Sequence, residues 1–92
     1  MARTRTKTLA SVLDAAERLI RWPRDRTRRD AALAHLAAKF ELGRTYTEAA
    51  VNEILRAWHL FDDPALLRRE LFDGGYLART RDCGQYWRLA AG

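Results

Sequence analysis

The 92-residue sequence predicts one small α+β domain that is mainly helical. Two observations lead to this prediction. Apolar residues recur at helical spacing through most of the chain, and two short β-prone runs follow around a turn near its end. A chain of this length buries about 60–65% of its unfolded surface, which is enough for one modest core. Its composition, 48% hydrophobic and 32% charged, is that of an ordinary soluble globular domain.

A first helix is predicted over residues 7–22. One face of it carries apolar residues at the spacing i, i+3, i+4, i+7: Leu9, Val12, Leu13, Ala16, Leu19 and Ile20. Pro23 should end this helix because proline lacks an N–H and crowds the residue before it. Residues 1–7 are expected to form a flexible basic arm, and residues 8–90 the single domain.

The middle of the chain predicts two more helices with a short strand between them. Leu33, Leu36, Ala37 and Phe40 mark a helix over residues 28–40. Thr47 is a good N-cap for a helix over residues 47–59, and Glu48 in its first turn suits the helix dipole. Residues 44–46 precede that cap and are predicted to form a very short strand.

The last third predicts a fourth helix and a hairpin. Asp63 caps Pro64, a strong start signal, and Gly74-Gly75 ends the helix after Asp73. The runs YLART and QYWRLA flank a turn at Asp82-Cys83-Gly84. Four helices closed by a C-terminal β-hairpin give a winged helix-turn-helix, in which the third and fourth helices form the helix-turn-helix and the hairpin is the wing.

Residues from about Pro23 to Leu89 resemble a bacterial family, domain of unknown function 2087. The similar features are FELGRTYTEAAVNEIL, the acid pair Asp62-Asp63, LLRRELFDGGYLAR and the final YWR. The resemblance implies a winged-helix-like fold and leans toward gene regulation, because such domains occur alone or attached to DNA-binding regulators. It implies no catalytic activity and no ligand.

The net charge of +5 is unevenly placed. Residues 1–44 carry eleven Lys and Arg against five Asp and Glu, whereas residues 45–92 carry six against seven. We name the stretch from Arg18 to Arg29, with six arginines and one acid, the basic connector. A helix N-terminus begins there, which also favours anions. The residues predicted to contact nucleic acid are Arg21, Arg24, Arg26, Arg28, Arg29, Arg69, Arg79 and Arg81.

The adjacent arginines of the fourth helix are predicted to differ in role. On a helical wheel Arg68 lies between Leu71 and Phe72, so it flanks the core and needs an acceptor. Asp62, Glu48 and Glu53 are the candidate acceptors. Arg69 points the other way, together with Asp73, and is either a nucleic-acid contact or solvated surface.

No catalytic, metal-binding or cofactor motif is present in the sequence. It has no glycine-rich phosphate loop, and its single cysteine, Cys83, allows neither a cysteine pair nor an internal disulfide. His35 and His59 lie on different predicted helices without a matched acid or nucleophile. We therefore predict a non-enzymatic protein without cofactor or metal, with no small-molecule ligand that can be named.

The favoured function is a small nucleic-acid-binding protein, a DNA-binding transcriptional regulator. It is expected to be cytoplasmic, not to associate with membranes, and to form a homodimer through the helix over residues 7–22. The alternative is a protein-interaction module on the same scaffold, with an acidic partner held by the basic connector. That alternative predicts an exposed apolar patch formed by Trp22 and Phe61.

Overall fold

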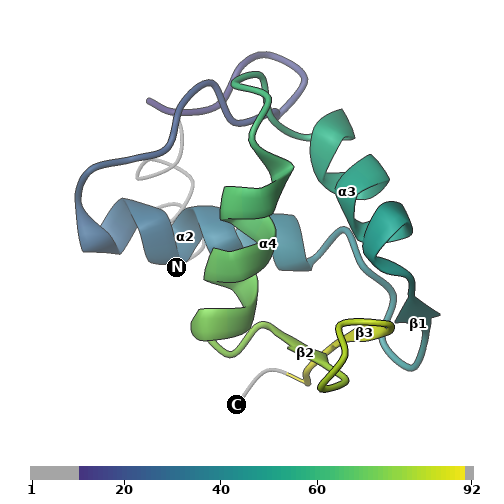
Figure 1. Cartoon of the computed structure of the whole chain (residues 1–92). Coiled ribbons are helices and arrows are strands. Elements are labelled where there is room, and N and C mark those ends of the chain that lie inside the picture. The colour runs from purple at the N-terminus through teal and green to yellow at the C-terminus, as the bar shows by residue number, and fades with distance from the viewer. Residues whose placement is uncertain (1–10, 91–92) are drawn as a thin grey trace.

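A computed structural model of the chain describes residues 11–90. In that part the protein is a small, mainly α, α+β fold with three helices and a three-stranded antiparallel sheet (Figure 1). The elements are α2 (Arg26–Ala37), β1 (Thr45–Tyr46), α3 (Glu48–Ala57), α4 (Pro64–Asp73), β2 (Leu77–Arg79) and β3 (Tyr86–Arg88).

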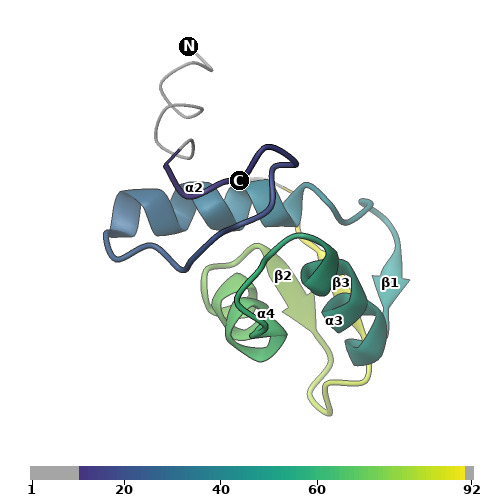
Figure 2. The ribbon, with the colours of Figure 1, turned by 90° about the horizontal axis from the view of Figure 1, so that it is seen from above.

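The sheet joins the short strand before α3 to the C-terminal hairpin. Its order is β1-β3-β2, so β3 lies in the centre. Tyr86 pairs with Tyr46 on one side and with Arg79 on the other. Both the short strand and the hairpin are therefore confirmed. The sheet lies at one end of α3 and α4 (Figures 1 and 2).

The caps of α3 and α4 are those that the sequence predicts. The Thr47 hydroxyl accepts the N–H of Ala50 at 3.0 Å, and the Asp63 carboxylate accepts that of Leu66 at 3.2 Å. Helix α4 has the predicted bounds, and α3 ends two residues before His59. Helix α2 begins two residues before the predicted start, because Asp25 caps it by accepting the N–H of Arg28. It ends at Ala37, and residues 38–40 leave it in a turn.

The helix predicted over residues 7–22 is wrong in its described part, residues 11–22. That segment folds back on itself in a small loop, with an antiparallel bridge between Leu13 and Leu19. The Asp14 carboxylate accepts the N–H groups of Ala16 and Arg18 at 2.9 and 2.8 Å. These bonds replace those of a helix, because a short acidic side chain competes for nearby backbone donors. Residues 7–10 lie outside the described part of the chain.

This loop is docked on the connection between α3 and α4. The N–H of Leu19 donates to Trp58 O, and the N–H of Leu60 donates to Leu19 O, both at 2.8 Å. The side chains of Val12 and Leu19 are fully buried. Val12 and Leu19 therefore reach the core as predicted, but through a loop and not through a helix face. Ala16 and Ile20, which the pattern placed on the same face, are exposed.

His59 closes the same connection from inside. Its Nδ1 lies 2.5 Å from Leu55 O, and its Nε2 lies 2.8 Å from the N of Asp63. The Asp63 N–H donates, so Nε2 accepts and Nδ1 carries the proton. His59 is buried with both ring nitrogens bonded, and it fixes the turn between α3 and α4.

The core lies between the three helices and the sheet. It is closed by α2 residues on one side and by the inner faces of α3, α4 and the hairpin on the other. Its fully buried side chains include Leu36, Phe40, Val51, Leu55, Leu67, Leu71 and Leu77.

Candidate nucleic-acid interface

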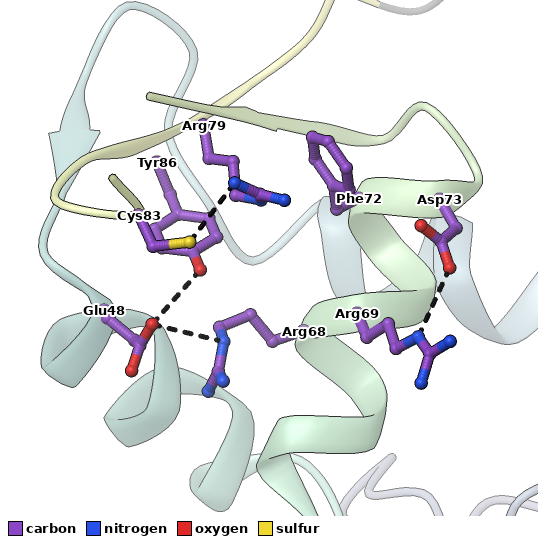
Figure 3. A pocket seen from close by; sticks show the side chains of 8 residues that line it. All are labelled: Glu48, Arg68, Arg69, Phe72, Asp73, Arg79, Cys83 and Tyr86. Atoms are coloured by element: carbon purple, nitrogen blue, oxygen red, sulfur yellow. Dashed lines mark hydrogen bonds and ion pairs between the residues drawn. The ribbon is translucent and has the colours of Figure 1, made fainter. Parts of the chain in front are cut away.

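A groove of about 280 Å³ lies between α4 and the hairpin (Figure 3). We name it the α4–hairpin groove. Three arginines, two carboxylates and two aromatic rings line it together with Cys83; they are Arg68, Arg69, Arg79, Glu48, Asp73, Phe72 and Tyr86. The structure therefore brings two of the predicted contact residues, Arg69 and Arg79, to one hollow.

Arg79 projects from β2 into this groove (Figure 3). Its guanidinium lies over the Phe72 ring, 4.2 Å from the ring centroid. Its Nη1 donates to Cys83 Sγ at 3.2 Å and to Thr80 O at 3.3 Å. The side chain is half-buried, and the partners that hold it are a ring, a sulfur and a carbonyl. Arg79 thus keeps a positive charge that no described carboxylate pairs.

Arg68 is structural, as predicted from the helical wheel. Its side chain is 20% exposed and lies 3.8 Å from Glu48, one of the expected acceptors. Its Nη1 also donates to Asn52 Oδ1, a partner on α3 that the sequence did not suggest. Arg68 therefore ties α4 to α3 from the wall of the groove.

Arg69 and Arg81 are the exposed cations on this side. Arg69 is 79% exposed and lies 3.7 Å from Asp73, one turn along α4. Arg81 lies exposed in the turn of the hairpin, and none of the described residues bonds its side chain. Both can move to meet an external anion.

Tyr86 forms the floor of the groove beside Cys83. It is 3% exposed, and its hydroxyl donates to Glu48 Oε1 at 3.3 Å. Burial raises the pKa of the Tyr86 phenol, and the neighbouring Cys83 thiol adds to the effect. The hydroxyl therefore stays a donor at neutral pH. Through this bond Tyr86 joins the hairpin to Glu48 in the first turn of α3.

The basic connector is largely occupied by contacts within the protein. Arg28 pairs with Asp25 at 2.8 Å, and Arg29 donates to Pro23 O at 2.7 Å while lying 5.5 Å from the centre of the Trp22 ring. Arg21 donates to Ser11 O at 3.3 Å. Two predicted contact residues keep exposed side chains without a partner among the described residues, Arg24 and Arg26.

The start of α2 is not an open anion site. Asp25 accepts the N–H of Arg28 there at 3.1 Å, so a carboxylate already satisfies that donor. The bonds from the Arg28 guanidinium and from the Arg28 N–H lower the pKa of Asp25, so it is charged at neutral pH. A carboxylate of the protein itself thus occupies this N-terminus, and binding of an external anion there stays a prediction.

A second groove, the α2–α4 groove, lies between the basic connector and the α4–hairpin groove. It is lined by Arg26 and Arg29 on α2 and by Glu70 and Asp73 on α4, with Asp30, Leu33 and Gly74. Asp73 lines both grooves. Acidic side chains therefore lie between the basic connector and the α4–hairpin groove.

The exposed patch expected of a protein-interaction module is not formed by Trp22 and Phe61. Both side chains are half-buried and pack against the core. Phe61 also lies edge-on to the His59 ring, with 4.8 Å between ring centroids. These two residues thus support the fold.

Two properties of the part of the chain that the structure describes bear on metal and membrane binding. Across residues 11–90, no three His, Cys, Asp or Glu side chains are grouped so that they could bind a metal ion. In the same range, every helix is too short or too polar to span a bilayer.

Comparison with known proteins assigns the chain to a family. The family described as "Uncharacterized protein conserved in bacteria" (DUF2087) matches residues 18–88. The chain belongs to this family. The DUF2087 match includes α2, α3, α4, the whole sheet and both grooves, and it leaves out residues 11–17 of the docked loop. No curated protein and no solved structure matches the chain.

Proposed function

We propose that this protein is a winged helix-turn-helix that binds DNA and regulates transcription. Its element order, helix, strand, helix, helix, strand, strand, and its sheet order β1-β3-β2 support the proposal. Between the C-cap of α3, Trp58, and the N-cap of α4, Asp63, residues 59–62 form a turn of the length that a helix-turn-helix uses, about three to four residues. The proposal uses three helices, with α4 as the helix presented to DNA and the β2–β3 hairpin as the wing.

The observation that carries this proposal is the α4–hairpin groove with its cations. Arg69 from α4 and Arg79 from β2 line the groove, and Arg81 extends from the turn of the hairpin. A helix and an adjacent β-ribbon that both present arginines fit a duplex, whose phosphates are spaced along both strands.

The acidic residues of α4 favour contacts to phosphates over extensive base reading. Glu70 and Asp73 lie on this helix, and Asp62 and Asp63 precede it. Carboxylates near phosphates are repelled, and only cytosine offers them a favourable donor in the major groove. We therefore expect binding that depends strongly on salt and weakly on sequence.

Fluorescence anisotropy tests the proposal directly. The chain is titrated into a labelled random duplex and a labelled single strand at several salt concentrations. Duplex binding should weaken steeply with salt, because each phosphate contact releases counterions. Arg81→Gln should reduce the slope of log affinity against log salt by about one.

Arg56→Gln is the matched control for this experiment. Arg56 is exposed in the last turn of α3, away from the hairpin. Its substitution by glutamine removes one positive charge, as Arg81→Gln does. It should leave the salt slope unchanged. Absence of duplex binding at about 50 mM salt, where phosphate contacts are strong, would contradict the proposal.

We also propose that the protein binds DNA as a homodimer, as helix-turn-helix proteins commonly do on paired half-sites. The helix expected to provide the interface does not form in residues 11–22, which are a docked loop. Sedimentation velocity with and without duplex tests the dimer. A monomer mass in both conditions would contradict it.

A further inference from the structure

The geometry points to a phosphate-binding site in the α4–hairpin groove, formed by Arg79 and Arg69 and weakened by Asp73 as an internal competitor. This inference rests on the proposed function, and it goes further by naming the bound group, the two cations and the residue that limits affinity.

Arg79 is the fixed cation of this site. Stacking on Phe72 and the bonds to Cys83 and Thr80 hold its guanidinium in one place. None of these partners is a carboxylate. A half-buried guanidinium with neutral partners has lost part of its hydration without gaining a counterion, which favours the entry of an anion. The remaining donors of its planar fork suit two phosphate oxygens.

Arg69 is the mobile cation. Its side chain is directed to Asp73 and away from Arg79 (Figure 3). Arg69 Nε and Asp73 Oδ2 are 3.7 Å apart, and both side chains are mostly exposed. This ion pair therefore holds Arg69 only weakly. A phosphate at Arg79 offers Arg69 a stronger acceptor across the same groove.

Asp73 opposes this site in two ways. It pairs with Arg69, and its own negative charge lines the groove that the phosphate would enter. The other carboxylate of the groove, Glu48, is occupied by Arg68 and the Tyr86 hydroxyl. Removing the charge of Asp73 should therefore strengthen phosphate binding, a gain that a purely structural role would not produce.

The test uses anisotropy with the labelled random duplex and the full chain. Asp73→Asn should tighten binding about threefold, from the loss of one exposed competing pair. Arg79→Gln should weaken binding about tenfold on every duplex and reduce the salt slope by about one. Arg79→Lys keeps the charge without the planar fork and should fall between wild type and Arg79→Gln.

Glu17→Gln is the matched control for Asp73→Asn. It removes the same charge from an exposed residue of the docked loop, at the end of the molecule away from the hairpin (Figure 1). The site is overturned if Asp73→Asn binds no more tightly than Glu17→Gln, or if Arg79→Gln binds like wild type. In either case duplex binding by the wild type would leave the proposed function standing.

A second measurement separates this inference from the proposed function. Inorganic phosphate is titrated into ¹⁵N-labelled protein, and the amide signals of residues 79–83 are followed by NMR. Saturable shifts in wild type that vanish in Arg79→Gln support the site. If such shifts occur and no duplex binds, the ligand of the site is a free phosphate compound. Absence of both these shifts and duplex binding overturns the site together with the proposed function.

Discussion

At the scale of single residues, neighbouring arginines have different roles because they face different surroundings. Arg68 is bonded to Asn52 and Glu48, whereas Arg69 is mostly exposed and faces Asp73. The helical wheel predicted this difference. It could not identify Asn52 as the partner, because the relative placement of α3 and α4 depends on their packing.

Arg68→Ala should lower the free energy of unfolding by about 1–3 kcal/mol, since it leaves partly buried acceptors without their charged donor. Arg69→Ala, the matched control, should change it by less than about 0.5 kcal/mol, as expected of a solvated position. Urea denaturation followed by circular dichroism measures both. Equal losses in the two variants would contradict a structural role for Arg68.

His59→Phe should destabilise the protein by about 2–3 kcal/mol. Phenylalanine fills similar space but leaves the N–H of Asp63 without its partner. It also removes one of the two bonds to Leu55 O, which keeps the N–H of Trp58. His35→Gln is the comparison, because His35 bonds Glu17 O at an exposed site. In thermal unfolding, His59→Phe should have a clearly lower melting temperature than His35→Gln. The reverse order would show that the turn does not depend on His59.

At the scale of elements, the sequence was most informative where local signals agree. Helix α4 has Asp63, Pro64 and Gly74 at its ends, and its predicted bounds are those of the structure. Residues 11–22 have a helical apolar pattern, but Asp14 binds the nearby N–H groups and Leu19 pairs with the α3–α4 connection. Periodicity cannot reveal a partner about forty residues away, so the tertiary contact decided the structure of this segment.

Three loop carboxylates should make the protein acid-sensitive. The N–H of Arg18 bonds Asp14, the side chain of Arg28 bonds Asp25, and the hydroxyl of Thr80 bonds Asp82; each bond lowers the carboxyl pKa. Because these pKa values are lower in the folded than in the unfolded state, the stabilisation is complete above the unfolded pKa, near pH 4. It is lost as the pH falls through the lower folded values.

Stability measured by urea denaturation between pH 7 and pH 2 checks this expectation. Asp14→Asn should flatten the acid limb of the curve, because one of the three linked carboxyl groups is gone. Asp62→Asn is the control, since none of the described residues bonds the Asp62 carboxylate. An acid limb that Asp14→Asn leaves unchanged would show that the loop carboxylate is not linked to folding.

At the scale of the whole molecule, the charge imbalance of the sequence does not become one continuous basic face. The arginine count located the basic connector, but Asp25, Pro23 and Trp22 use several of its side chains. The α4–hairpin groove could not be predicted, because it depends on Phe72, Cys83 and Tyr86 meeting from separate elements.

The double variant Arg24→Gln/Arg26→Gln should weaken duplex binding and reduce the salt slope by about two if DNA reaches the basic connector. Its stability should stay within about 0.5 kcal/mol of wild type, because both side chains are exposed. Anisotropy across a salt series measures the slope. An unchanged slope would confine the DNA contact to the α4–hairpin side.

The pairing of Leu19 with the α3–α4 connection also provides a kinetic reporter. The amide hydrogen of Leu60 is bonded to Leu19 O, so it is shielded from solvent exchange only while the loop is docked. Its deuterium exchange should therefore report undocking of the loop, separately from global unfolding. Leu19→Ala should speed exchange at Leu60 far more than at Leu67, whose amide hydrogen bonds to O of Asp63, the N-cap of α4.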